Sequence, residues 1–389
     1  MWYFRSPEIV FGQNALDHLA ELEGRRALIV TDPNVAALGF VDLVRDRLVD
    51  AGLEVAVFAE VEPDPCLDTV RRGAQRALAF EPDWIVGLGG GSSIDAAKSI
   101  WIQYERPDLD PDDVAPFGKL GLRQKARLIA IPTTSGTGAE VTWPIVLTDH
   151  DEQRKVSVGH SENIPDLAIV DPLFVADLPP RITADTGMDV LTHAVEGYAS
   201  DWATDFTDGL CLKAIQLVFD YLPRSYERGA ADPEAREHMH NAATIAGLGF
   251  GNAIATLAHG IGHALGAGIH LPHGRMVGLC LPYTIEFTVH GDVPTRYTGI
   301  ARSLGLPAGS EVEAAGCLAG AVRDLATRIG QPTSLAAAGV TREAFELALP
   351  LLINNALNDS ATTVSPRFPG DDEIERLLWC IYDGTPVDF

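Results

Sequence analysis

The chain has 389 residues, of which 46% are hydrophobic, and its formal net charge is −25 at pH 7. Single hydrophobic cores stop growing near roughly 250–300 residues, so a chain of this length is expected to form two domains. The strong negative charge argues against nucleic acid and against anionic membranes as binding partners.

The cysteine content and the hydropathy of the chain indicate the cellular compartment in which the protein works. The five cysteines are widely scattered and form no CxxC pair, which fits a reducing environment and provides no sulfur-based metal site. No apolar run reaches the roughly 18–20 residues that a membrane span needs, and the first residues lack the pattern of a signal peptide. The sequence therefore predicts a cytoplasmic protein with no membrane partner.

The first half of the chain alternates short β-rich runs with helical segments. Such alternation is typical of a parallel sheet with helices on both faces. We therefore expect a Rossmann-like α/β domain over residues 1–178. Strands are predicted at 27–31, 54–58, 84–88, 128–131 and 167–170, and helices at 41–51, 67–80 and 94–103.

The second half of the chain is predicted to be helical. Beyond Pro179 and Pro180 the β-rich runs disappear, and Ala/Leu-rich segments with helical spacing replace them. An all-α domain is expected over residues 179–389. Its helices are predicted at about 183–200, 207–225, 233–265, 312–329, 342–349 and 372–382.

A glycine run follows the predicted strand at 84–88 and precedes a helix. Glycines let a backbone approach a phosphate closely, and a helix N-terminus offers unpaired N–H groups with a favourable dipole. Gly89, Gly90 and Gly91 meet these conditions, with Ser92 as the candidate N-cap. The spacing differs from the GxGxxG fingerprint, and a tight structural turn would also use glycines here.

A second polar loop, residues 132–140, follows the predicted strand at 128–131. Its Thr, Ser and Gly donors, Thr133 and Thr134 among them, suit a pyrophosphate or a ribose. A simple polar loop is the alternative. Doubly wound folds hold nucleotides at the carboxyl ends of parallel strands, so two such loops favour a dinucleotide site.

Asp32 closes the predicted strand at 27–31. A carboxylate there could bond a ribose hydroxyl and repel a 2′-phosphate, which would favour NAD over NADP. It could equally be the N-cap of a short turn that begins at Pro33.

Four histidines gather within residues 256–276. His259 and His263 are four residues apart in a predicted helix, so both point from one face. Residues 268–272 are expected to break the helix and to place His270 and His273 in the turn that follows. Imidazoles arranged in this way commonly surround a transition metal. Partly buried histidines that bond the backbone are the alternative.

Asp189 and His193 are four apart on another predicted helix, so their side chains converge. Together with two histidines from residues 256–276 they would supply four ligands. Mixed nitrogen and oxygen ligation suits Fe(II), Zn, Mn or Co. A hydrogen bond between Asp189 and His193 is the structural alternative.

These segments together resemble the iron-containing (group III) alcohol dehydrogenase family. The resemblance extends over nearly the whole chain, and the motifs occur in the family's order. They are SPEIVFGQNAL at 6–16, GGGSSIDAAK at 89–98, PTTSGTGAEVT at 132–142, DLAIVDP at 166–172, GMDVLTHAVEGY at 187–198, LAHGIGHALG at 257–266, LPHG at 271–274 and SPRFP at 365–369.

The resemblance implies a dehydroquinate synthase-like fold, with the metal and the active site in the cleft between the two domains. The cofactor is expected to be NAD rather than NADP because of the carboxylate at Asp32. The resemblance implies a divalent metal, Fe²⁺ first and Zn²⁺ second. It also implies a homo-oligomer, dimeric or larger. The metal ligands fall on Asp189, His193, His259 and His273, and the non-ligand histidine near the nicotinamide falls on His263. The cofactor contacts fall on Asp32, Gly89, Gly90, Gly91, Ser92, Thr133, Thr134, Thr142 and Lys155.

The expected activity is hydride transfer between NAD(H) and a small alcohol or aldehyde, with the metal polarising the substrate oxygen. His263 is expected either to relay a proton or to orient the site. A glycerol dehydrogenase-like or other metal enzyme of the same fold is the nearest alternative, and a non-catalytic NAD or metal sensor is another. The implied substrate lining is apolar and bulky: Trp143, Pro144, Phe250, Ala361 and Thr362.

Overall fold

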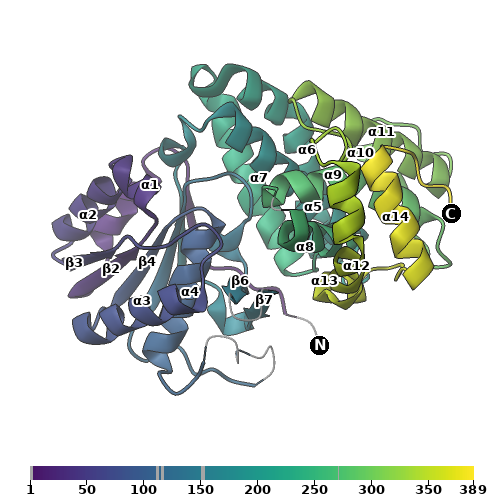
Figure 1. Cartoon of the computed structure of the whole chain (residues 1–389). Coiled ribbons are helices and arrows are strands. Elements are labelled where there is room, and N and C mark those ends of the chain that lie inside the picture. Colours follow the sequence, from purple (N-terminus) through teal and green to yellow (C-terminus); the bar gives the residue numbers. More distant parts are fainter. Residues whose placement is uncertain (1–2, 111–113, 115–117, 150–153, 270) are drawn as a thin grey trace. The chain divides into compact units, whose positions relative to one another are not determined.

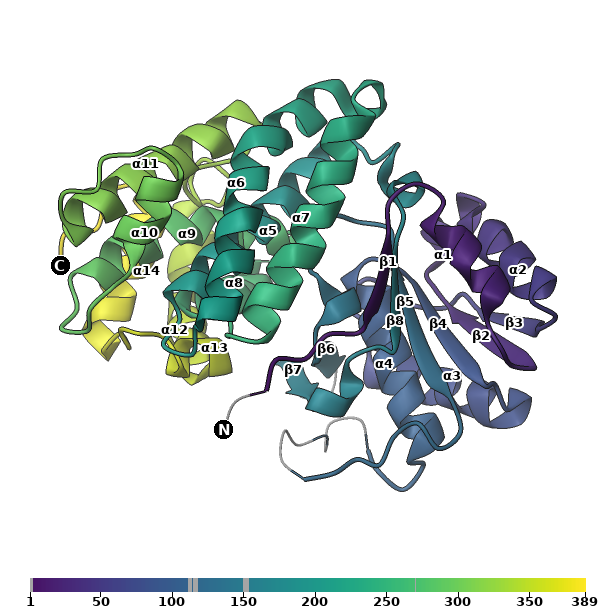
Figure 2. The same cartoon turned by 180° about the vertical axis from the view of Figure 1, so that it is seen from behind.

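The computed structural model describes residues 3–110, 114, 118–149, 154–269 and 271–389 of the chain. The chain divides into two compact units, residues 1–177 and residues 178–389 (Figures 1 and 2). The first is a parallel α/β unit and the second is helical, so the predicted fold class is confirmed. None of the described helices combines the length and the hydropathy that crossing a membrane requires.

The N-terminal unit is built on a six-stranded sheet in the order β1-β8-β5-β4-β2-β3. Every neighbouring pair in it is parallel, so the carboxyl ends of all six strands lie at one edge. The strands are β1 (Glu8–Phe11), β2 (Arg26–Val30), β3 (Glu54–Phe58), β4 (Trp84–Gly89), β5 (Arg127–Pro132) and β8 (Leu167–Val170).

Both faces of this sheet are covered by helices (Figure 1). Successive strand residues point to opposite faces, so a strand buried on both sides is apolar throughout. On β2, Leu28 and Val30 belong to one core cluster, whereas Ala27 and Ile29 belong to the other. The first cluster is completed by α3 (Leu67–Phe80) and α4 (Gly91–Glu105), and the second by the 3₁₀ helix η1 (Ala15–Glu21) and α2 (Phe40–Asp50).

An antiparallel hairpin, β6 (Pro144–Asp149) and β7 (Arg154–Gly159), is anchored to α4 by a buried ion pair. Lys98 is fully buried, and its Nζ lies 3.6 Å from Asp95 Oδ1 and donates to the Pro144 carbonyl at 3.1 Å. The other Asp95 oxygen accepts from the Val146 N–H at 3.0 Å. Burial lowers the pKa of Lys98 and raises that of Asp95, and each opposite charge counteracts the shift.

The helical unit surrounds a single large core cluster, in which α5 packs against α6, α7 and α9. Its helices are α5 (Pro180–Ala199), α6 (Asp205–Arg228), α7 (Pro233–Gly251), α8 (Leu257–Ile269), α9 (His273–Val289), α10 (Tyr297–Ser303), α11 (Glu311–Arg328), α12 (Arg342–Asn358), α13 (Ser360–Thr363) and α14 (Asp371–Asp383).

Several predicted helix boundaries in this unit are wrong. The helix predicted over 233–265 is two helices, because the chain leaves α7 through Ile254, whose φ of 134° is incompatible with a helix. Helices α9 and α10 were not predicted, and α12 continues past Pro350 to Asn358. His273 was expected to lie in a turn, but it is the first residue of α9.

Replacing Lys98 by Met should destabilise the N-terminal unit. The substitution leaves the Asp95 carboxylate buried without its cation, and breaking a buried pair in this way costs about 3–5 kcal/mol. Urea unfolding followed by tryptophan fluorescence would show a lower midpoint. Arg47→Met is the control, since Arg47 and Asp17 form an exposed pair that should matter little. Equal midpoints for Lys98→Met and wild type would contradict the expectation.

Candidate metal centre and nucleotide loops

Three predicted ligands converge in the helical unit. Asp189 and His193 lie one turn apart on α5, and His259 lies in the first turn of α8. One ligand atom from each lies within 4.8 Å of the others, and all three residues are buried. Asp189 Oδ1 is 3.6 Å from His193 Nδ1 and 3.8 Å from His259 Nε2.

His273, the fourth predicted ligand, reaches the same point from α9. Its Nε2 lies 3.6 Å from Asp189 Oδ1, and its side chain is 42% exposed, whereas that of Asp189 is 3% exposed. The cluster is therefore buried on the α5 side and open on the His273 side. A centre that binds a substrate needs such an open position.

The spacing of the ligand atoms suits coordination of a divalent ion better than hydrogen bonds among the ligands themselves. Asp189 Oδ1, His193 Nδ1 and His259 Nε2 are buried without a hydrogen-bond partner, which is costly unless another group satisfies them. Separations of 3.6–3.8 Å exceed hydrogen-bond distances. They are close to the edge, roughly 3.3–3.6 Å, of a tetrahedron with ligands about 2.0–2.2 Å from an ion. The hydrogen bond considered as an alternative for Asp189 and His193 is not formed.

The environment keeps two of these groups in their metal-binding protonation states. Burial alone would raise the pKa of Asp189, but the imidazoles around it, His193 first, hold that pKa well below its usual range. Burial lowers the pKa of His193 to about 3. At neutral pH the aspartate is therefore ionised and His193 is neutral, as ligation requires.

Glu196 is a functional residue that the sequence analysis missed. Its Oε2 accepts a hydrogen bond from His259 Nδ1 at 2.5 Å. Burial would lower the pKa of His259, but the carboxylates of Glu196 and Asp189 together raise it to about 9. The available signal was its spacing, because Glu196 follows Asp189 by two helical turns on α5 and so shares its face.

His263 lies beside the ligands and has a carboxylate partner of its own. Its Nδ1 lies 3.0 Å from Asp359 Oδ2, and its ring stacks on that of His273 with centroids 5.5 Å apart. The other Asp359 oxygen caps α13 by accepting from the Ala361 N–H at 2.8 Å. No sequence pattern connected Asp359 with this histidine.

Part of the predicted apolar lining is also at this site. Phe250, near the end of α7, stacks on His193 with centroids 4.0 Å apart. Thr362 is buried with its hydroxyl unpaired, and a Cβ at Gly260 would approach that hydroxyl to 2.0 Å, so α13 packs directly on α8. Trp143 and Pro144 belong to the N-terminal unit.

In the N-terminal unit, the two polar loops lie side by side. They follow β4 and β5, which are neighbours in the sheet, and the Thr133 N–H donates to the Gly89 carbonyl at 2.9 Å. Gly89 has a φ of 148°, and a Cβ there would meet Ser93 Oγ at 2.5 Å, so only glycine fits. Gly90, rather than the predicted Ser92, is the N-cap of α4.

Asp32 caps the start of a short helix, which is one of the two roles predicted for it. Its Oδ1 accepts from the N–H groups of Asn34 and Val35 at 2.9 and 3.1 Å, at the start of α1 (Pro33–Ala37). Its Oδ2 accepts from Ser93 Oγ at 3.2 Å, which ties the end of β2 to the first turn of α4. The carboxylate therefore lies beside the glycine loop.

Among the remaining predicted cofactor contacts, the structure describes the side chains of Thr134 and Thr142 but not that of Lys155. Thr134 is half-buried next to Gly90, and Thr142 is buried directly after the 3₁₀ helix η3 (Ala139–Val141). Lys155 lies in β7 opposite Thr148, and its side chain is outside the described part of the chain. His270 also lies outside the described residues.

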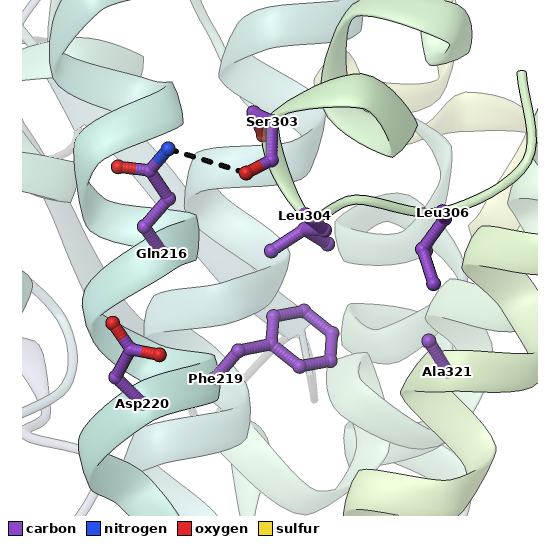
Figure 3. Close-up of a pocket in the computed structure, with 7 residues that line it drawn as sticks. All are labelled: Gln216, Phe219, Asp220, Ser303, Leu304, Leu306 and Ala321. Atoms are coloured by element: carbon purple, nitrogen blue, oxygen red, sulfur yellow. Dashed lines mark hydrogen bonds between the residues drawn. The ribbon is translucent and has the colours of Figure 1, made fainter.

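A groove of about 380 Å³ lies elsewhere in the helical unit (Figure 3). Gln216 Nε2 donates to the Ser303 carbonyl at 3.4 Å across it. It shares no residue with the metal cluster. Its lining consists of Gln216, Phe219, Asp220, Ser303, Leu304, Leu306 and Ala321.

Family models match both units of the chain. Residues 6–172 match iron-containing alcohol dehydrogenase, and residues 183–382 match the C-terminal domain of the Fe-containing alcohol dehydrogenase family. The fold and the site thus define an oxidoreductase with a divalent metal. The chain belongs to the iron-containing alcohol dehydrogenase family, and the predicted family and enzyme class are confirmed.

Individual relatives agree along their whole length. The NADPH-dependent butanol dehydrogenase of Clostridium saccharobutylicum is 40% identical, with 98% of each chain covered. The structure of a 1,3-propanediol oxidoreductase superposes with a TM-score of 0.90 at 33% identity, covering 98% of this chain and 100% of that one. A sulfoacetaldehyde reductase from Bifidobacterium kashiwanohense, solved with NAD⁺, gives 0.86 at 29% identity, with 98% of both chains covered. Relatives therefore differ in nucleotide.

Gly274→Ala should weaken metal retention. A Cβ at Gly274 would lie 2.2 Å from the Asp185 carbonyl oxygen and 3.0 Å from Asp189 Cβ. Since a backbone carbonyl cannot rotate away, α9 would have to move and take His273 with it. Elemental analysis after dialysis should find several-fold less metal than in wild type. Gly209→Ala on α6, where a Cβ meets nothing within 4 Å, is the control, and equal metal content in both would refute the role of Gly274.

Proposed function

We propose that the chain transfers a hydride between NAD(H) and small, largely uncharged alcohols or aldehydes, with a divalent metal, Fe²⁺ by preference, held by Asp189, His193, His259 and His273. The observation that carries the proposal is the cluster of three buried and unpaired ligand atoms 3.6–3.8 Å apart. The open His273 side of the cluster is where a substrate oxygen would enter.

A divalent ion bound there would polarise the substrate oxygen as a Lewis acid and favour loss of its proton near neutral pH. The chain's own residues supply the orientation. Asp189 contributes the one anionic ligand, and the stacking of Phe250 on His193 keeps that side of the site apolar. The described lining residues Phe250, Ala361 and Thr362 carry no charge, which suits an uncharged substrate and disfavours a hydroxy acid.

The nucleotide is proposed to bind at the carboxyl ends of β4 and β5. Gly90 and Gly91 lie at the start of α4, and their backbone N–H groups would hold the pyrophosphate. Thr133 and Thr134 would contact the nucleotide from the neighbouring loop, which follows β5. Ser92, Thr142 and Lys155 complete the proposed contacts. A nucleotide bound there would supply the hydride chemistry, as NAD⁺ would accept the hydride of the carbinol carbon in alcohol oxidation while the hydroxyl proton would leave separately.

His263 is proposed to accept that proton. Asp359 holds Nδ1 of the ring, so the neutral imidazole presents its Nε2 lone pair as the base. The side chain of His263 is 24% exposed, which provides a route to solvent that the fully enclosed His193 lacks.

The preference for NAD is proposed from Asp32. Its carboxylate is half-buried next to the glycine loop, where it would repel the 2′-phosphate of NADP while accepting a hydrogen bond from a ribose hydroxyl. The assignment of 1–178 to nucleotide binding and 179–389 to metal binding and catalysis is part of the proposal. Cytoplasmic location and a homo-oligomer stay predictions from the sequence.

Alcohol turnover tests the proposal directly. Metal-loaded protein, NAD⁺ and a panel of small primary alcohols should increase the absorbance at 340 nm. His259→Ala and Asp189→Ala should abolish this activity and metal retention, while leaving NAD⁺ binding close to wild type, because the nucleotide loops lie in the other unit. Cofactor binding without turnover of any alcohol or aldehyde would refute the activity, and equal metal content in wild type and variants would refute the ligands.

Asp32→Asn should raise the use of NADP relative to NAD. The amide oxygen can still cap α1, so the variant removes the charge with little change in the fold. The ratio of kcat/KM for NADP⁺ to that for NAD⁺ should increase several-fold, while the affinity for zinc stays the same. An unchanged ratio would show that this carboxylate does not select the nucleotide.

A further inference from the structure

Glu196 is a buried carboxylate beside the metal cluster that none of the predicted roles uses. Its side chain is 5% exposed, and each of its two oxygens has a different set of partners. Oε2 accepts from His259 Nδ1 at 2.5 Å. Oε1 accepts from Thr256 Oγ1 at 3.0 Å and from the Ala258 N–H at 2.6 Å.

The Oε2 contact decides which nitrogen of His259 is available to a metal. A carboxylate can only accept, so Nδ1 must keep a proton, and Nε2 is then the nitrogen that gives up its proton and offers a lone pair when a metal binds. Nε2 is the buried nitrogen without a hydrogen-bond partner, and it faces Asp189 Oδ1 at 3.8 Å. Glu196 thus holds His259 in the tautomer that ligation at this point needs.

The Oε1 contacts are structural. Ala258 lies at the second position of α8, where helix N–H groups lack partners within the helix, and an anion there is favoured by the helix dipole. Glu196 therefore also joins the start of α8 to α5. Oε1 therefore holds the two helices together, whereas Oε2 acts on the metal ligand His259.

Glu196 has no room to contact a substrate. The space beside it measures about 10 Å³ and is lined in part by Thr256, Thr284 and Tyr297. A space of this size holds one water molecule at most. Any effect of Glu196 on the reaction must therefore pass through His259.

The charges of the cluster also point to a function for Glu196. With Asp189 and Glu196 ionised and the imidazoles neutral, the side chains carry two negative charges, which balance a divalent ion. Buried charge that is not balanced is costly. Removing the charge of Glu196 would leave the loaded centre with a net positive charge in a buried site.

We infer that Glu196 is a positioning residue of the metal centre, which fixes the tautomer of His259 and supplies the second negative charge that balances the ion. The inference rests on the proposed function, because it assumes that this cluster holds a divalent metal. It adds a determinant of metal affinity that makes no contact with the metal or the substrate.

The test compares zinc affinity with the stability of the metal-free protein. In Glu196→Gln the amide oxygen can keep the contacts with Thr256 and Ala258, which turns the amide N–H group toward His259 Nδ1. That nitrogen must then accept, so the proton moves to Nε2 and blocks ligation. Competition with a chromophoric chelator should show a zinc dissociation constant about 10–100-fold higher than in wild type. The unfolding midpoint of the metal-free protein should fall only modestly, because the contacts with Thr256 and Ala258 are kept while the anion at the start of α8 is lost.

Two further variants separate this role from a structural one. Thr256→Val removes a hydrogen bond to Oε1 only, and should lower the stability of the metal-free protein while the zinc dissociation constant stays near that of wild type. Glu286→Gln is the matched control for a carboxylate in the same unit, since Glu286 pairs with Arg323 at 2.6 Å, and it should leave zinc affinity unchanged.

Equal zinc affinity in Glu196→Gln and wild type would overturn the inference. So would a loss of zinc affinity in Thr256→Val as large as that in Glu196→Gln, because a purely structural role would then be sufficient. Wild-type protein that binds no zinc, with Asp189→Ala indistinguishable from it, would overturn the proposed function as well. Zinc binding that depends on Glu196 without alcohol turnover would refute only the proposed reaction.

Discussion

The close packing of α5 against α9, together with the hydrogen bonds that join Glu196 of α5 to the start of α8, is the constraint on which the metal centre depends. Helix α5 presents Asp189, His193 and Glu196 on one buried face, and the other two helices must bring their histidines to it. The first turn of α9 approaches so closely that a Cβ at Gly274 would overlap the backbone carbonyl of Asp185 in α5. The ligand separations of 3.6–3.8 Å follow from this packing, and no single segment could produce them.

The nucleotide loops depend on a different constraint, the order of the strands. Because β4 and β5 are neighbours and parallel, the loops that follow them meet at one edge of the sheet. The backbone bond from Thr133 to Gly89 and the carboxylate of Asp32 on Ser93 then hold the glycine loop in shape. These contacts lie within the protein itself and involve residues that directly follow or begin the elements at this edge of the sheet.

The elements whose bounds were predicted correctly are those that a local residue pattern determines. Strand β3 and helix α3 have the predicted bounds because their apolar residues alternate or repeat clearly and are bounded by turn residues. The break between α7 and α8 depends on the backbone of Ile254, which no local pattern required. Glu196 and His259 are 63 positions apart, and Asp359 and His263 are 96 apart, so sequence spacing could not pair them.

The different functions proposed for His259 and His263 rest on a difference in their surroundings. They lie one turn apart on α8, and each has a carboxylate oxygen within hydrogen-bond distance of its Nδ1. Burial separates them: the side chain of His259 is 4% exposed and faces Asp189, whereas that of His263 is 24% exposed. An enclosed nitrogen next to an anion favours a bound cation, and a nitrogen open to solvent can exchange a proton. The proposed division between ligand and base therefore rests on the packing around each ring, because both rings have a carboxylate beside Nδ1.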